Sequence, residues 1–185
     1  MSDILKVENV TLQFGGVKAI TDISFNVKEG EICAVIGPNG AGKSSMLNVI
    51  NGVYLPQIGT VTYDGVERKS INPRDAAIPG MARTFQNIAL FQGMNVLENI
   101  MTGRNLFMKS TWLEQGLNIG RAREEERVNR LAVEKVIKFL QIESIRKTPV
   151  AKLPYGLQKR VELGRALVAE PKILLLDEPM AGMNL

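Results

Sequence analysis

Histidine is absent from this 185-residue chain, and cysteine occurs only once. The chain therefore has no imidazole to serve as an acid, a base or a metal ligand. The single cysteine, Cys33, excludes an internal disulfide framework and fits a reducing, cytosolic setting. No apolar run approaches the ~18 residues that a membrane span requires, and residues 1–8 carry charges where a signal peptide is apolar. We therefore expect any role at a membrane to come through a partner.

The chain also lacks a strong excess of one charge. Its formal net charge is +4, which is too small to indicate a nucleic-acid partner by itself. The densest charged run, residues 123–127, lies within a segment, 121–140, whose apolar residues recur at helical spacing. These apolar residues are Val128, Leu131, Val133, Val136, Ile137 and Leu140. We interpret the run as the solvated face of a long helix, and a nucleic-acid contact is the less favoured alternative.

A phosphate-binding pattern is present near the N-terminus. Residues 37–44 match G-x-x-x-x-G-K-[ST] at every position. The residues expected to hold a nucleotide are this loop and the serine after it: Gly37, Pro38, Asn39, Gly40, Ala41, Gly42, Lys43, Ser44 and Ser45. Lys43 is expected to reach the β- and γ-phosphates, and the Ser44 hydroxyl to bind Mg²⁺.

The context of the loop supports this interpretation. The apolar run 32–36 before it predicts a buried parallel strand, and residues 45–51 after it predict a short helix closed by Gly52. In such a strand–loop–helix unit, glycines let backbone N–H groups turn toward phosphate oxygens, and the helix N-terminus adds partial positive charge. An ordinary glycine-rich turn is the alternative. The match of residues 37–44 to every position of the phosphate-loop pattern disfavours it.

Two carboxylates follow an apolar run near the C-terminus. Residues 173–176 are apolar and lead into Asp177 and Glu178, as at the carboxyl end of a buried parallel strand, where ligands bind in open α/β sheets. Asp177 is expected to assist the metal, and Glu178 to act as general base toward water. Alone, two solvated acids at a strand end would be an equal alternative. The phosphate loop earlier in the chain favours the functional interpretation.

Other segments predict an α/β protein. The predicted elements are strands over 4–14, 23–27, 59–63 and 81–85, and helices over 95–101 and 121–140. Asp64-Gly65 is a turn signal, Asn95 a helix cap, and Gln86 ends the last of these strands. Residues 153–167 predict a loop followed by an amphipathic helix. A second phosphate contact near Gly156, at the start of that helix, is the alternative.

These motifs, in this order, resemble the ATP-binding subunits of ABC transporters. The resemblance rests on the phosphate loop, Gln86, the segment 153–165 and Asp177-Glu178-Pro179, and it covers essentially the whole chain. Within the family, the chain is most similar to importers of branched-chain amino acids, urea or amides. The implied fold is an α/β P-loop NTPase with an N-terminal antiparallel β subdomain, a RecA-like parallel sheet and an inserted helical subdomain, here without the C-terminal strands.

The resemblance also implies roles for single residues. It makes residues 1–185 one ATP-binding domain, with a core of 1–86 and 166–185 and a helical subdomain of 87–165. Phe14 would stack on adenine, although a buried strand residue is the alternative. Gln86 would contact Mg²⁺ or the attacking water. The implied cofactors are ATP and Mg²⁺.

The same resemblance implies partners and a location. Two ATPase subunits would pair head to tail, and one signature segment would close over the ATP of the other subunit. That segment consists of Leu153, Pro154, Tyr155, Gly156, Leu157 and Gln158. The helical subdomain would dock on transmembrane permease subunits at the cytoplasmic face of the membrane, and no nucleic-acid partner is expected.

Two departures from the family pattern lead to further expectations. Pro154 stands where the signature has a serine hydroxyl for the γ-phosphate, and the chain ends at Leu185 without the family's γ-phosphate histidine. We therefore expect a truncated chain that binds ATP and hydrolyses it slowly. The alternatives are a nucleotide-binding module without efficient turnover and a soluble ABC ATPase outside transport.

Overall fold

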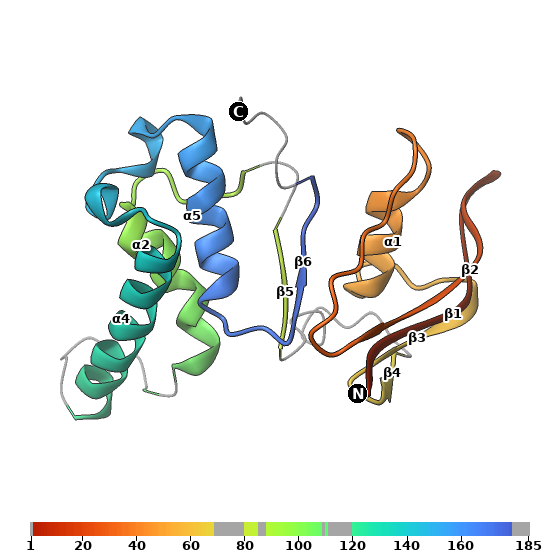
Figure 1. The fold of residues 1–185 in the computed structure, drawn as a ribbon, viewed down its shortest axis with the longest axis horizontal. Helices are drawn as coiled ribbons and strands as arrows, with labels where there is room; N and C mark the ends of the chain where they lie inside the picture. The colour runs from red at the N-terminus through yellow and green to blue at the C-terminus, as the bar shows by residue number, and fades with distance from the viewer. Residues whose placement is uncertain (1, 69–79, 85–87, 109, 111–119, 179–185) are drawn as a thin grey trace. The chain divides into compact units, whose positions relative to one another are not determined.

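The computed structural model describes residues 2–68, 80–84, 88–108, 110 and 120–178 (Figure 1). The chain divides into two compact units, Met1–Pro79 and Gly80–Leu185, and each is described by itself. The division into a core and an inserted helical subdomain stays a prediction. None of the helices among the described residues has the length and apolar character that crossing a bilayer demands.

The first unit contains an antiparallel sheet with the strand order β2-β1-β3-β4 (Figure 1). Its strands are β1 Asp3–Phe14, β2 Val17–Lys28, β3 Ile58–Tyr63 and β4 Val66–Glu67. The predicted Asp64-Gly65 turn joins β3 to β4, and its two residues have φ of 48° and 77°. Positive φ at both central residues is what a tight turn between right-twisted strands requires. The predicted N-terminal strands are thus confirmed.

The helix predicted after the phosphate loop is α1, Lys43–Ile50, which begins two residues earlier than expected. It ends as predicted, because Gly52 has φ 73° and donates its N–H to the Val49 carbonyl at 3.0 Å. Its buried residues are Met46, Val49 and Ile50. They belong to the core of the unit with side chains of the sheet: Val7, Val10, Leu12, Ile20, Val61 and Tyr63.

Residues 32–36 correct one prediction. They form no strand in the structure, Ile32 is 97% exposed and Ile36 92% exposed, and Cys33 is also exposed. A central parallel strand obtains its hydrogen bonds and its burial from the strands beside it. The sheet of the first unit is antiparallel and does not include this segment, so the apolar run alone does not make it a buried strand.

The second unit contains two parallel strands, β5 Met81–Arg83 and β6 Ile173–Leu175. Their register places Arg83 opposite Leu175, and the Thr84 N–H continues the pairing by donating to the Leu175 carbonyl at 3.0 Å. The predicted parallel strand before Asp177 is confirmed. Its predicted burial holds only in part. Leu175 is buried, Ile173 and Leu174 are half-buried, and Leu176 is 40% exposed, because side chains alternate between the two sides of an extended chain.

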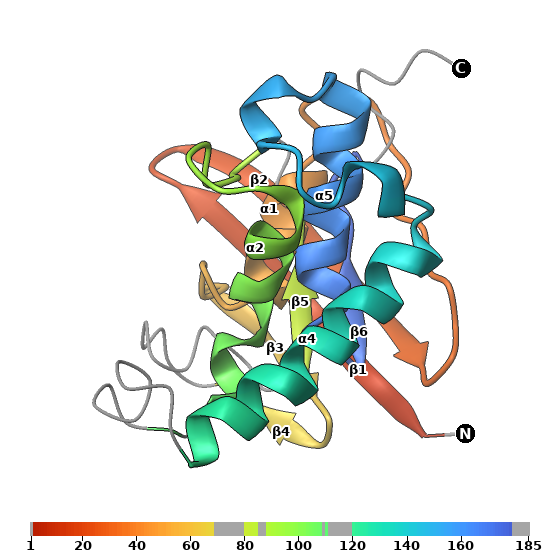
Figure 2. The same cartoon turned by 90° about the vertical axis from the view of Figure 1, so that its left-hand side faces the viewer.

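Helices form most of the described part of the second unit (Figure 2). They are α2 Val96–Met101, η1 Thr102–Phe107, α4 Arg121–Phe139, η2 Glu143–Ile145, η3 Val150–Lys152 and α5 Tyr155–Leu167. Asn95 caps α2 as predicted: its side chain accepts from the Glu98 N–H at 3.0 Å, while Glu98 accepts from the Asn95 N–H at 2.9 Å.

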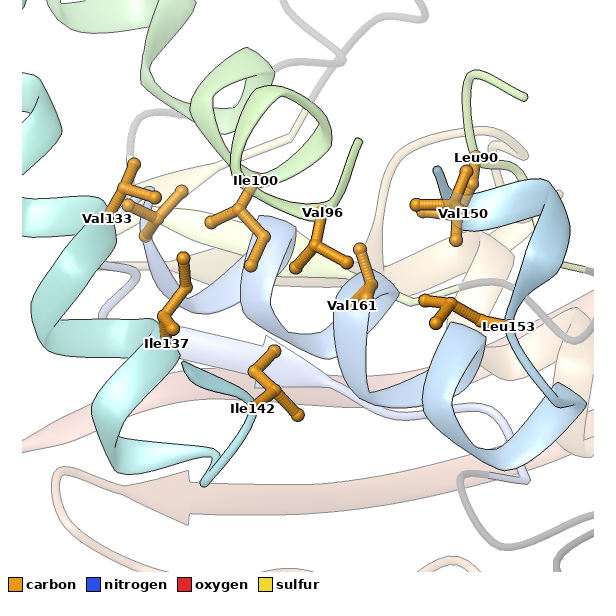
Figure 3. Packing of buried hydrophobic residues seen from close by; sticks show 10 residues of the cluster. Leu90, Val96, Ile100, Val133, Ile137, Ile142, Val150, Leu153 and Val161 are labelled. Carbon is orange, nitrogen blue, oxygen red and sulfur yellow. The ribbon is translucent and has the colours of Figure 1, made fainter. Parts of the chain in front are cut away.

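Helices α2, α4 and α5 share one apolar core (Figure 3). Ile100 of α2, Val133 and Ile137 of α4, and Val161 of α5 are all 0% exposed. Close approach of α2 and α5 depends on Gly164, where an added Cβ would lie 2.9 Å from the Ile100 Cδ1. Glycine at position 164 therefore leaves room for Ile100 on the inward side of α5.

The inward face of α4 differs in part from the predicted one. Val128 and Leu131 are 46% and 53% exposed, whereas Asn129 is buried. Asn129 is buried because its Oδ1 accepts a hydrogen bond from the Arg104 Nε at 2.9 Å. The run 123–127 is mainly exposed, as expected, and a hydrogen bond from Arg127 lowers the pKa of Glu124.

Arg104 connects three parts of the helical unit. Besides Asn129, its guanidinium donates to the Val168 carbonyl at 3.0 Å and to Glu170 Oε1 at 2.8 Å, and it lies 3.8 Å from the centre of the Phe107 ring. Its side chain is only 7% exposed. We expect Arg104→Met to lower the free energy of unfolding by about 2–4 kcal/mol, because it leaves buried acceptors without a donor.

Urea denaturation followed by circular dichroism measures the effect of Arg104→Met. Arg127→Met is the matched control, since the Arg127 side chain is 64% exposed in its pair with Glu124, and surface pairs contribute about 0–1 kcal/mol. An equal decrease in the free energy of unfolding in the two variants would contradict the structural role of Arg104.

Candidate active site

The phosphate loop turns sharply before α1. Gly40 and Gly42 have φ of 82° and 86°, a region that favours glycine. The Ala41 N–H donates to the Pro38 carbonyl at 3.2 Å, and the Met46 N–H to the Gly42 carbonyl at 2.8 Å, where the helix begins. The loop thus leads directly into a helix N-terminus, the arrangement that presents backbone N–H groups to an anion.

Gly42 also fixes the loop against β2. A Cβ at Gly42 would lie 2.3 Å from the Ala19 carbonyl oxygen, so no other residue fits without moving the backbone. In β2, Ala19 lies two residues from Val17, which pairs with Phe14 of β1. The loop and the predicted adenine-stacking residue therefore lie at the same end of one hairpin.

Phe14 is accessible to a ligand. It is 45% exposed, which excludes the alternative of a buried strand residue. The ring of Tyr54 meets it edge-on, with the ring centres 5.0 Å apart and an interplanar angle of 74°. Beside these rings, Gln13 N–H donates to Gln57 Oε1 at 2.8 Å, and Gln57 Nε2 donates to the Gln13 carbonyl at 3.0 Å. Adenine stacking on Phe14 stays a prediction.

Lys43 is held against the start of the loop. Its Nζ donates to the carbonyls of Gly37 and Pro38, each at 2.8 Å. The ammonium of Lys43, the first residue of α1, therefore lies where the loop turns, and the neighbouring Ser44 is exposed. Two hydrogen bonds from one cation keep both the loop and the charge in place.

The two predicted carboxylates differ in their surroundings. Asp177 is buried, and its Oδ2 accepts a hydrogen bond from Arg83 Nη2 at 3.1 Å. Glu178 is exposed and has φ 47°, a left-handed conformation that is uncommon for a glutamate. Burial alternates from Leu175 to Glu178, so the side chains of the two acids lie on opposite sides of the chain. This agrees with separate predicted roles, Asp177 toward the metal and Glu178 toward water.

The signature segment forms the start of α5. Leu153 is buried, Pro154 is exposed and Tyr155 is 44% exposed at the first helical position. Gln158 is half-buried and ties the segment together, because its Nε2 donates to the Leu153 carbonyl at 2.8 Å. Gly156 and Leu157 follow in the first turn, where the Leu157 N–H donates to the carbonyl of the cap residue Pro154 at 3.0 Å.

The structure thus groups the predicted residues by unit. Phe14 and residues 37–45 lie in the first unit, and the signature segment, Asp177 and Glu178 in the second. Gln86 and Pro179 lie outside the described residues. Reasoning from sequence missed Arg83. The available signal was its position near the end of a predicted strand, since carboxyl ends of parallel strands meet at one edge of a sheet.

Each unit contains a hard oxygen donor of the kind that Mg²⁺ prefers. The donor of the first unit is the Ser44 hydroxyl, and that of the second is the Asp177 carboxylate. Among the described residues, no group of three or more histidine, cysteine, aspartate or glutamate side chains could hold a metal ion.

Comparisons with known proteins agree on a family. The family model described as ABC transporter matches residues 20–181. BraF of Pseudomonas aeruginosa, a high-affinity branched-chain amino acid transport ATP-binding protein, is 33% identical over 181 residues, which cover 98% of this chain and 71% of that protein. RbsA 2 of Burkholderia cenocepacia, a ribose import ATP-binding protein, is 34% identical over 184 residues, which cover 34% of its length.

Solved structures give the same result. The ADP conformation of MJ1267, an ATP-binding cassette of an ABC transporter, has a TM-score of 0.80 and 32% identity, covering all of this chain and 72% of that one. The dimeric structure of MJ0796, a bacterial ABC transporter cassette, has a TM-score of 0.80 and 26% identity, covering 97% and 76%. The predicted α/β P-loop fold is confirmed by these similarities.

Proposed function

This chain belongs to the ABC transporter family, whose ATP-binding subunits are ATPases, and from that premise we propose that it hydrolyses ATP to drive import of amino acids or similar small solutes. The observation that carries the proposal is the similarity, over 98% of the chain, to proteins named for branched-chain amino acid transport. The phosphate loop at the N-terminus of α1 supports it.

Nucleotide binding is the first step of the proposed mechanism. The N–H groups of the loop and of the start of α1 bind the phosphates, with Lys43 neutralising charge on the β- and γ-phosphates. Phe14 stacks on adenine through its exposed face. Gly42 keeps the loop beside the hairpin that carries Phe14, so the phosphates and the adenine would bind at the same end of that hairpin.

Hydrolysis is the second step. Glu178 accepts a proton from water, the water oxygen attacks the γ-phosphorus, and the bond from phosphorus to the bridging oxygen of ADP breaks. We propose that Ser44 and Asp177 hold Mg²⁺, with Gln86 near the metal or the water. When bound, Mg²⁺ neutralises charge on the phosphate oxygens. Glu178 is exposed, so water can reach its carboxylate.

We propose two kinds of partner. A second ATP-binding subunit pairs head to tail, as the dimeric MJ0796 cassette supports, and residues 153–158 of one subunit cover the ATP of the other. With Pro154 in place of a hydroxyl, this contact relies on N–H groups at the start of α5. No nucleic-acid partner is proposed.

Transmembrane permease subunits are the other proposed partner, and they hold the chain at the cytoplasmic face of the membrane. Residues 91–95 suit docking because Asn99, 0% exposed, fixes their backbone. Its Oδ1 accepts from the Phe91 N–H at 2.9 Å, and its Nδ2 donates to carbonyls that include that of Phe91 at 3.1 Å. The side chains of Phe91 and Met94 in this loop are exposed.

Phosphate release by the purified chain with MgATP, alone and with permease subunits in proteoliposomes, tests this function. We expect slow release by the chain alone, faster release with the permease, and ATP-dependent uptake of an amino acid. ATP binding without phosphate release under both conditions would indicate a nucleotide-binding module instead. Release stimulated by nucleic acid and not by permease would indicate an ATPase outside transport.

A further inference from the structure

We propose that Arg83 is a positioning residue for Asp177, fixing the carboxylate that receives the Mg²⁺–nucleotide. The inference rests on the proposed role of Asp177 in the metal site and adds a residue that acts through it. Its starting point is the contact of Arg83 Nη2 with Asp177 Oδ2 at 3.1 Å. Both side chains are nearly covered, with 7% and 8% exposure.

The register of β5 and β6 explains how the two residues meet. Arg83 is the last residue of β5 and pairs with Leu175, and the Thr84 N–H continues the ladder to the Leu175 carbonyl. Asp177 lies two residues further, on the same side of the chain as Leu175. A long side chain at the end of β5 therefore reaches the first buried position after β6, across one strand spacing.

Burial makes this contact different from a surface ion pair. A carboxylate removed from water needs a compensating charge or hydrogen bond, and removing one member of a buried pair leaves the other uncompensated. The Arg83 guanidinium supplies both, because its Nη2 donates a charge-assisted hydrogen bond to Asp177 Oδ2. The parallel ladder fixes the backbone of Arg83. It thus holds the Asp177 carboxylate in one orientation, as partners beyond the direct ligands of a metal do.

The test measures how Mg²⁺ strengthens nucleotide binding, not turnover. The affinity of a fluorescent ATP analogue for the full chain is determined in EDTA and across a Mg²⁺ titration. We expect Arg83→Met to raise the Mg²⁺ concentration at half-maximal effect about 10-fold or more, as loss of such partners typically does, while the affinity in EDTA is unchanged. We expect Asp177→Asn also to raise the Mg²⁺ concentration at half-maximal effect.

A double variant separates positioning from a general structural role. Because Arg83 acts through Asp177, Arg83→Met combined with Asp177→Asn should shift the Mg²⁺ dependence no further than Asp177→Asn alone. Arg104→Met is the matched control: it removes another buried arginine of the same unit, so it should lower stability and leave the Mg²⁺ dependence unchanged. Additive shifts in the double variant would overturn the inference.

The remaining outcomes separate this inference from the proposed function. If Asp177→Asn leaves the Mg²⁺ dependence unchanged, the metal role of Asp177 and the inference both fail. If Asp177→Asn shifts it and Arg83→Met does not, only the inference fails. Should Arg83→Met not fold, Arg83→Lys decides, because lysine keeps the charge without the planar guanidinium. We expect an intermediate shift, and wild-type behaviour of Arg83→Lys would overturn positioning by Arg83.

Discussion

Glu178→Gln will bind ATP with wild-type affinity and will release phosphate at least about 100-fold more slowly, the lower end of what a general base contributes. The amide has the size of the carboxylate and cannot accept the proton of the attacking water. Nucleotide affinity should not change, because the residues proposed to hold the phosphates lie in the loop and α1. Phosphate release at saturating MgATP, with a parallel nucleotide titration, measures both quantities.

Glu170→Gln is the matched control for this prediction. Glu170 is also a glutamate of the second unit with positive φ, 49° against 47° for Glu178. Its side chain is 66% exposed and pairs with Arg104, away from the proposed chemistry. We expect Glu170→Gln to keep wild-type turnover, whereas equal losses in the two variants would point to the local backbone. Wild-type turnover in Glu178→Gln would remove Glu178 from the mechanism.

The elements that the sequence predicted well are those with local signals. The turn at Asp64-Gly65 needs two residues that tolerate positive φ, and the cap of α2 needs Asn95 and Glu98 at one fixed spacing. Gly52 closes α1 for the same kind of reason. Each of these features depends on a few neighbouring residues, so the sequence contains all the information needed.

Predictions of burial were weaker because burial depends on distant residues. The apolar segment 32–36 reads as a core strand, yet it is exposed in the first unit. On α4, Val128 and Leu131 have the spacing of inward residues, but the buried position is Asn129, which binds Arg104. Helical periodicity cannot reveal such a polar partner 25 residues away.

The candidate site shows the same division between local and distant information. The phosphate loop is one continuous motif, and its glycine conformations and its position before α1 follow from the sequence. The contact of Arg83 with Asp177 joins residues 94 positions apart. It becomes visible only when the register of β5 and β6 is known, because that register decides which side chains share an edge.

Lys43→Ala will remove most of the nucleotide affinity, which makes it the largest effect on binding that we expect. Lys43 holds an ammonium at the turn of the loop, 2.8 Å from two loop carbonyls, from where it is proposed to reach two phosphates. Each charge-assisted hydrogen bond contributes about 1.5–3 kcal/mol. Loss of two such bonds lowers affinity about 100-fold or more, since 1.4 kcal/mol corresponds to a factor of ten.

The control for Lys43→Ala should remove the same charge from the same unit at a site away from the loop. Lys6→Ala does so, because Lys6 lies on β1 and forms an exposed pair with Glu8 at 2.8 Å. We expect this variant to keep wild-type affinity in an equilibrium titration with a fluorescent ATP analogue. Equal losses in both variants would indicate a general electrostatic effect. Unchanged affinity in Lys43→Ala would show that the γ-phosphate is bound by other residues.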